Sequence, residues 1–369
     1  MRKVELVGKF FDNHSLSIVN RNLALNLKDK VDLRCIAVDE PSSNKVDKTE
    51  IAEIIKLTQK AESVPEIQIR HSYPPIWNWP VSDSTRIVYI QPWEYKSVPF
   101  EWQYKFETFA DLVIAPSQFN GSAYTASGLS PHRVRVIANG YNPEVYFNKN
   151  IRTYDKIKVL YVGCHQFRKG VDILLNLWSK ATKNSDNLSL TIKDTPSVYG
   201  QSNLHNDIVK LQYKTKCAEI VYDDTSKTDV EMSDMYNEHH IVVHPYRGEG
   251  FGMHIQEAMA CGCIPIVTNG GSTDDFVKDY KIQSNTRVVN MYDIFGLKPE
   301  DSGTMMGQHK FVLEPDINDF AIKTQKVLAN IKEEKVDTSL LKTWSEISDE
   351  YINALEYLMS NFDYVKRRK

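Results

Sequence analysis

The sequence has no run of apolar residues long enough to cross a bilayer, which takes about 20. The short apolar segment of the opening MRKVELVGKFFDNHS ends at Lys9, too early for the apolar part of a secretory signal, so the chain is expected to be cytoplasmic. Its five cysteines are an odd number without CxxC spacing, which argues against a disulfide framework and a zinc site. We expect them to be buried small hydrophobic residues.

An excess of positive charge is also absent. The formal net charge is −3, and no Lys/Arg run is long enough for a dedicated binding arm, so nucleic acid is not an expected partner. The basic end YVKRRK (364–369) is expected to be a solvated tail. Weak peripheral association with an anionic membrane surface is its alternative.

The chain is ordinary in composition, and its length of 369 residues favours two domains. Short apolar runs such as VELVG, RIVYIQ and DLVIAPS alternate with helical patterns, and the same alternation starts again at IKVLYVG after a polar stretch. This order predicts two α/β domains with parallel sheets, over 1–150 and 151–340. The last segment, 341–369, has apolar residues at helical spacing and predicts an amphipathic helix.

Glycines are few, yet three fall in the first six residues of RGEGFGMHIQEAMACG (Arg247–Gly262). HIVVHP before them is apolar enough for a buried strand, and MHIQEAMA is a strong helix former. The glycines are therefore predicted in a strand-to-helix turn, where free N–H groups and the helix dipole attract anions. Gly250 and Gly252 indicate a ligand such as phosphate close to the backbone.

Two glutamates flank this predicted anion site. Glu249 lies in the loop, whereas Glu257 lies one turn inside the helix, on the same face as Met253. A carboxylate accepts hydrogen bonds from vicinal hydroxyls, so this spacing is typical of a sugar joined to phosphate. The alternative is a solvated loop residue and a glutamate that complements the helix dipole.

A basic pair provides the expected counter-charge. Arg168 and Lys169 immediately precede a helix that is predicted to begin near Gly170. Cations at that position oppose the helix dipole, and an anionic ligand would remove the conflict. Solvated surface charge is the alternative interpretation.

Two segments, YVGCHQFRKGVDILL and HPYRGEGFGMHIQEAMACGCIPIVTNGG, resemble the donor half of GT-B glycosyltransferases of family 4, which are retaining and use nucleotide sugars. QPWEYKSVPFEW, SQFNGSAYTASGLSPHRVRVIANGYNPEVYF and TNGGSTDDFV are similar to a bacterial-type branch of that family. The resemblance implies two Rossmann-like α/β domains that face a central cleft, with the C-terminal helix crossing back to the N-terminal domain.

The resemblance also assigns roles. Arg168 and Lys169 would bind the donor diphosphate, and Glu257 would bind the ribose hydroxyls. Glu249 would hold the transferred sugar together with backbone amides. The implied catalytic residues are Glu249, Arg168 and Lys169, and the implied donor-binding residues are Arg168, Lys169, Glu249, Gly250, Phe251, Gly252, Met253 and Glu257. No metal is implied, and the sequence has no DxD triplet. Asp223-Asp224 and Asp274-Asp275 are interpreted as turn residues, with Asp275 near the donor.

The first domain is expected to bind the acceptor. Its first loop has a single Gly8 in place of GxGxxG, which argues against a nicotinamide cofactor. His14 follows at a predicted helix start, with capping as the alternative. Glu94 lies in YIQPWEYKSVP, where many relatives carry a histidine, and His71 is a weaker candidate. His239, His240 and His244 are interpreted as structural.

These observations predict a retaining hexosyltransferase that moves sugar from a UDP- or GDP-sugar to a glycan or lipid-linked acceptor, without a metal cofactor. Base recognition is expected around IKDTPSVYG and IVYDD. One alternative is a sugar-nucleotide isomerase of the UDP-sugar 2-epimerase type, which shares the architecture. The other is a catalytically silent sugar-nucleotide binding subunit.

Overall fold

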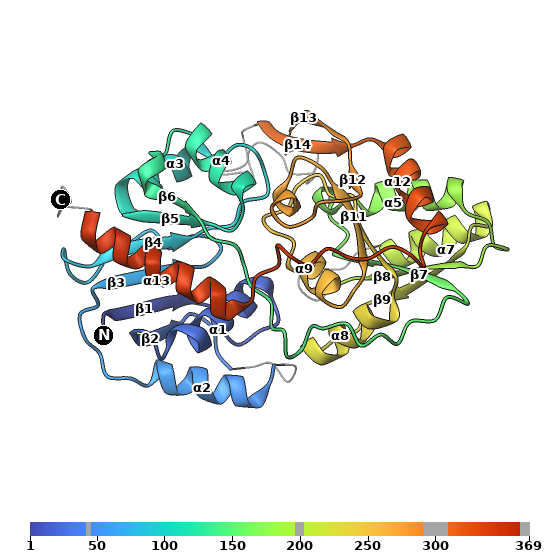
Figure 1. Ribbon diagram of the computed structural model, residues 1–369. Helices are drawn as coiled ribbons and strands as arrows, with labels where there is room; N and C mark the ends of the chain where they lie inside the picture. The colour runs from blue at the N-terminus through green and yellow to red at the C-terminus, as the bar shows by residue number, and fades with distance from the viewer. Residues whose placement is uncertain (42–45, 196–202, 291–308, 362–369) are drawn as a thin grey trace. The chain divides into compact units, whose positions relative to one another are not determined.

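The computed structural model describes residues 1–41, 46–195, 203–290 and 309–361. It divides the chain into two compact units (Figure 1). The first unit consists of residues 1–140 together with the C-terminal segment from Lys342, and the second runs from Tyr141 to Leu341. The YVKRRK end lies outside the described residues, as does most of TPSVYG. Each unit is described by itself.

A six-stranded parallel sheet forms the centre of the first unit, in the order β2-β1-β3-β4-β5-β6. Its strands are β1 (Lys3–Gly8), β2 (Asp32–Ala37), β3 (Ile67–His71), β4 (Arg86–Ile90), β5 (Leu112–Ala115) and β6 (Val134–Val136). Its helices are α1 (Ser15–Leu27), α2 (Lys48–Thr58), α3 (Phe100–Phe109), α4 (Gln118–Ala126), the 3-10 turn η1 (Pro131–Arg133) and α13 (Trp344–Asn361). The strand order reverses between β1 and β3, so ligands are expected at the carboxyl ends of these strands.

Both faces of the first sheet are covered at its centre, where β4 is mostly apolar and β3 also buries the polar Gln68, Arg70 and His71. All five residues of β3 and all five of β4 are buried. Loop residues end each run and let helices return over the sheet, as the alternating pattern predicts.

The C-terminal helix α13 packs on α1 of the first unit (Figure 1). Trp344, Ile347, Tyr351 and Leu355 recur at three- and four-residue spacing and are at most 4% exposed. Lys30, which follows α1, donates to Asp349 at 2.5 Å. The expectation that the final helix returns to the N-terminal part of the chain is confirmed.

A second six-stranded parallel sheet forms the other unit, in the order β12-β11-β10-β7-β8-β9. Its strands are β7 (Ile157–Val162), β8 (Leu188–Lys193), β9 (Glu219–Asp223), β10 (Ile241–His244), β11 (Ile264–Thr268) and β12 (Lys281–Ile282). Its helical segments are η2 (Phe167–Lys169), α5 (Val171–Ala181), α7 (Leu204–Thr215), α8 (Asp229–Glu238), α9 (Met253–Ala260), η3 (Ser272–Asp275) and α12 (Ile317–Ala329). Here the order reverses between β7 and β10, which pair directly.

Two features complete the fold. An antiparallel ribbon of β13 (Ser284–Asn290) and β14 (His309–Pro315) was not predicted from the sequence pattern. All five cysteines are buried and unpaired, as expected. Among the helices that the structure describes, none combines the length and apolarity needed to span a bilayer.

Candidate active site

The glycine-rich loop lies at the carboxyl end of β10 and leads into α9. Gly252 precedes the helix with φ +97°, a left-handed conformation that glycine adopts without strain. A Cβ there would lie 3.0 Å from Cγ2 of Thr273, so space as well as φ requires glycine. Gly252, the N-cap residue, has no side chain to cap this helix start, which is therefore suited to an anion.

The basic pair lies on the neighbouring loop. Arg168 and Lys169 end η2, after β7, and Gly170 follows with φ +73°. A Cβ on Gly170 would lie 1.9 Å from the carbonyl oxygen of Pro245, so the two loops touch at backbone distance. The amide of Arg247 donates to the carbonyl of Arg168 at 2.7 Å. Parallel strand pairing thus brings the two motifs together at the point where the strand order reverses.

Glu249 is the centre of the site and is only 8% exposed. Lys169 Nζ lies 2.5 Å from its Oε2, and Arg168 Nη1 lies 3.9 Å from its Oε1. Its own loop also contributes, since the amide of Gly250 donates to Oε1 at 3.0 Å. Burial opposes the charge, yet Lys169, the hydrogen bond from His244 and Arg168 together hold the pKa of Glu249 well below its usual range. Glu249 is therefore an anion with fixed partners.

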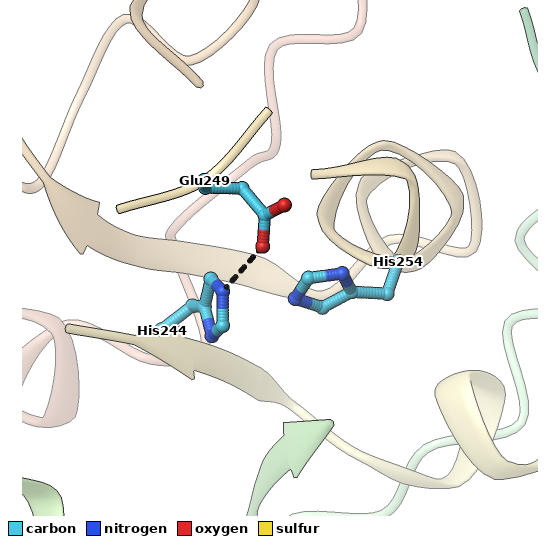
Figure 2. A group of neighbouring side chains, drawn as sticks. All are labelled: His244, Glu249 and His254. Carbon is cyan, nitrogen blue, oxygen red and sulfur yellow. Dashed lines mark hydrogen bonds and ion pairs between the residues drawn. The ribbon is translucent and has the colours of Figure 1, made fainter. Parts of the chain in front are cut away.

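Two histidines lie beside this carboxylate (Figure 2). His244 Nε2 lies 3.2 Å from Glu249 Oε2, and the rings of His244 and His254 meet edge to face with centroids 4.4 Å apart. Burial lowers the pKa of His244 to about 4 and that of His254 well below its usual range. His244 is thus neutral, and because the carboxylate can only accept, Nε2 carries the hydrogen. The sequence interpretation of His244 as purely structural missed this contact.

His244, Glu249 and His254 place candidate metal-ligand atoms within 4.8 Å of one another. Two neutral imidazoles and a carboxylate are a ligand set that zinc accepts. However, the Lys169 ammonium already holds the same carboxylate, and Arg168 adds a second positive charge nearby. A divalent cation would have to displace Lys169 against this field. The charge balance therefore favours an anionic ligand.

The buried Arg247 side chain connects the glycine-rich loop and the loop of the basic pair to neighbouring elements. It is 5% exposed and donates to both carboxylate oxygens of Asp172 in α5, at 2.8 and 2.7 Å. It also reaches Glu314 in β14 at 3.1 Å and the carbonyl of Phe167 at 2.9 Å. This role could not be predicted from the sequence, because its partners lie far away along the chain, at Phe167 and Asp172 and at Glu314.

Glu257 lies on α9, as predicted, and is half-buried. The hydroxyl of Tyr236 donates to its Oε2 at 3.1 Å. Burial, with a smaller effect of Asp229, raises the pKa of Glu257 to about 8. The side chain is therefore protonated at neutral pH in this structure, in contrast to Glu249.

The other donor-side residues surround the loop. Phe251 is buried against Phe276, and its carbonyl accepts from Ser272 in η3. Met253 begins α9 and is half-buried. Asp274 and Asp275 belong to η3, as the turn interpretation requires. The ligand roles of these residues stay predictions.

The acceptor-side candidates belong to the first unit. A Cβ on Gly8 would lie 2.4 Å from both the Asn20 amide nitrogen and the His71 carbonyl, so the close approach here is to the chain itself. His14 caps α1, accepting from the Leu16 amide at 3.3 Å. Glu94 is half-buried and helps to raise the pKa of Tyr124, after burial as the larger cause. Roles for Gly8, His14 and Glu94 in acceptor binding stay predictions.

The fold and the geometry of the candidate site together indicate the class of protein. Two Rossmann-like units, with a basic pair and a glutamate-flanked helix start at the switch point of the second, are GT-B-like. Residues 144–293 match the model of the family "Glycosyl transferases group 1". This segment, less than half of the chain, is similar to that family and contains the E-x7-E motif.

Curated relatives match a comparable part of the chain. A GDP-mannose:cellobiosyl-diphosphopolyprenol alpha-mannosyltransferase from Xanthomonas oryzae pv. oryzae is 29% identical over 159 residues, 42% of this chain and 40% of the relative. An uncharacterized glycosyltransferase of Methanocaldococcus jannaschii is 31% identical over 149 residues, which are 40% of this chain and 38% of the relative. The chain therefore spans about 40% of the length of these relatives.

Solved structures extend the likeness in fold to nearly the whole chain. Sucrose-phosphate synthase from Thermosynechococcus elongatus superposes with a TM-score of 0.62 at 16% identity, covering 98% of this chain and 100% of that chain. HepE of Anabaena in complex with UDP-glucose gives 0.57 at 13% identity, covering 96% and 100%. At such identities the comparison concerns the fold alone, and it confirms the GT-B-like architecture.

Proposed function

We propose that this protein is a retaining glycosyltransferase that moves a hexose-type sugar from a nucleoside-diphosphate sugar to a glycan or lipid-linked acceptor. The observation that carries the proposal is the buried Glu249 carboxylate, held by Lys169 beside an uncapped helix start. An anion, two cations and a helix start, which lie together at the carboxyl ends of β7 and β10, suit a ligand that joins sugar hydroxyls to a diphosphate.

The proposed chemistry separates opposite charges. Cleavage of the bond from sugar to diphosphate builds positive charge on the sugar ring and negative charge on the leaving phosphate. Arg168, Lys169 and the α9 amides would stabilise the phosphate, which is the larger electrostatic contribution. Glu249, held rigidly by His244 and the Gly250 amide, would orient sugar hydroxyls. Glu257 would accept hydrogen bonds from the ribose.

The nucleotide base and the acceptor are proposed only as classes. The Xanthomonas relative is named for GDP-mannose and a cellobiosyl-diphosphopolyprenol, and HepE was solved with UDP-glucose. Both UDP- and GDP-hexoses are therefore donors to test, and a polyprenyl diphosphate carrying a glycan is the first acceptor to test. Transfer needs no metal ion in this account, because two side-chain cations and a helix start serve the diphosphate.

Product analysis tests the proposal against its two alternatives. Radiolabelled UDP- and GDP-hexoses are incubated with the protein, with and without cellobiosyl-diphosphopolyprenol, and sugar products are separated. Transfer predicts free nucleoside diphosphate and a labelled acceptor with retained anomeric configuration. Conversion of the nucleotide sugar without any acceptor would instead identify an isomerase. Tight nucleotide-sugar binding with no product at all would identify a silent binding subunit.

A further inference from the structure

A second arrangement of polar groups lies in the first unit, at the carboxyl ends of β1 and β3. His71 is the last residue of β3 and is aligned with Gly8, the last residue of β1, in the parallel register. The imidazole is only 2% exposed. This is where the strand order of the first sheet reverses, the usual ligand position in a sheet of this kind.

The hydrogen bonds of Asn20 fix which nitrogen of His71 carries a hydrogen. Asn20 Nδ2 donates to the carbonyl of Lys9 at 2.9 Å and to that of His71 at 3.3 Å. Its Oδ1 therefore faces His71 Nδ1, at 2.8 Å. An amide oxygen can only accept, so Nδ1 donates and Nε2 presents a lone pair.

That lone pair has no partner of its own. Among the residues that the structure describes, none hydrogen-bonds to His71 Nε2, and this atom is not among the fully enclosed polar atoms. Burial, with a smaller effect of His14, lowers the pKa of His71 to about 3. The ring therefore stays neutral and accepts a hydrogen bond, but it is too weak a base to take a proton near pH 7.

Gly8 makes this arrangement possible. A side chain at that position would collide with the Asn20 amide and the His71 carbonyl, each 2.4 Å from the Cβ position. The glycine thus keeps Asn20 against His71 and fixes the imidazole. Nε2 is therefore held in place as an accessible acceptor, and a ligand O–H group can donate a hydrogen bond to it.

We propose that His71 Nε2 accepts a hydrogen bond from a hydroxyl of the sugar acceptor, which binds at the β1 and β3 ends of the first unit. This inference rests on the proposed function and names the acceptor-binding residue for it. His71 is thus a positioning residue for the acceptor hydroxyl, and its neutral imidazole does not take the proton from it.

Two substitutions test the proposal as a matched pair. His71→Asn retains an amide N–H near the Nδ1 position for Asn20 but lacks any group at Nε2. His71→Gln places an amide oxygen near Nε2. With cellobiosyl-diphosphopolyprenol as the acceptor probe, His71→Asn is expected to raise the acceptor KM by about tenfold or more, the loss expected for one buried hydrogen bond. His71→Gln is expected to recover part of that loss.

Donor titration and NMR separate this inference from the proposed function. UDP and GDP affinities of both variants should equal those of the wild type, and both variants should stay folded at the assay temperature, although substitution of a buried side chain lowers the unfolding temperature. In the ¹⁵N-labelled wild type, the His71 Nε2 signal should respond to the acceptor probe but not to UDP or GDP. An unchanged acceptor KM in His71→Asn, an equal rise in donor KM, or an Nε2 signal unmoved by the probe while the donor still turns over would overturn the proposal.

Discussion

At the scale of single residues, Lys169 has two competing partners. In this structure it holds Glu249 at 2.5 Å, whereas the proposed function assigns it to the donor phosphate. Donor binding would then require Lys169 to exchange one anion for the other. Glu249→Gln removes the competing charge at nearly constant volume, so we expect UDP and GDP to bind several-fold more tightly while sugar transfer falls by about a hundredfold.

Calorimetry with the free nucleotides and steady-state kinetics with the sugar nucleotides check these opposite effects. Glu219→Gln is the matched control, because Glu219 is exposed and pairs with Lys156 rather than with the basic pair. Weaker nucleotide binding in Glu249→Gln would contradict the exchange.

Glu257 gives a prediction of pH dependence. Burial raises the pKa of Glu257 to about 8, so its carboxyl group holds a proton at neutral pH in this structure. Ribose hydroxyls that donate to the carboxylate would lower this pKa, and binding would release the proton. Nucleotide affinity is therefore expected to rise with pH from about 6 to about 8 and then to level off. Glu257→Gln should remove this dependence.

The proton release is measured by calorimetry in two buffers that differ in ionisation enthalpy. The Glu257 carboxyl group also makes the free energy of unfolding depend on pH, in the opposite direction to nucleotide affinity. Its folded-state pKa lies above the unfolded value, so the stability it contributes is present at low pH and declines as the pH rises through about 8. Proton uptake on nucleotide binding would refute the ribose role.

At the scale of elements, Arg247 connects the loop before α9 to α5 and β14 through Asp172 and Glu314. Lysine cannot reproduce this forked contact. Arg247→Lys is expected to lower the free energy of unfolding by about 1–3 kcal/mol and to weaken nucleotide binding. Denaturant unfolding and calorimetry measure the two effects.

A control comes from the same ion-pair network. Arg287 is 57% exposed, and Glu314, at 3.1 Å, is its only ion-pair partner among the residues that the structure describes. Arg287→Lys should change the free energy of unfolding by less than about 0.5 kcal/mol. Equal effects of the two substitutions would show that Arg247 is an ordinary surface cation.

The sequence predicted those elements whose signals are local. Glycines are poor helix formers, yet they lie just before α9, and the cations before α5 oppose the dipole of that helix. Both signals are visible within a few residues of sequence. The pairing of Asn20 with His71 could not be predicted, because it depends on the alignment of β1 with β3. The same holds for His244, whose ring looks structural until the return of the loop places Glu249 against it.

The ribbon of β13 and β14 could not be predicted from the sequence, for a different reason. The two strands are far apart in sequence, and neither is flanked by the short turn motif that indicates a hairpin. Base recognition in the TPSVYG region remains a prediction, since residues 196–202 lie outside the described chain.

At the scale of the whole molecule, the C-terminal helix belongs to the first unit although it follows the second in sequence. Leu355 is 1% exposed in α13, and Leu355→Ala is expected to cost about 2–5 kcal/mol. The loss should be confined to the first unit. Hydrogen exchange is expected to show faster exchange in α1 and β1, with β10 and α9 unchanged.

Leu340→Ala is the comparison, because Leu340 is 42% exposed and lies outside α13. It should leave exchange in α1 unaltered. Uniform loss of protection across both units after Leu355→Ala would contradict the separate stability of the two units.

The central claim is that the basic pair and the α9 start together bind the donor diphosphate. Titration calorimetry of UDP and GDP against the wild type and the double variant Arg168→Gln/Lys169→Gln tests it most directly. The account predicts that the wild type binds at least one of the two nucleotides. It predicts that the double variant loses about a hundredfold or more in affinity while it stays folded at the assay temperature, although its unfolding temperature falls because the buried Glu249 loses its cations. Equal affinity in both proteins, or loss of binding only in step with unfolding, would contradict it.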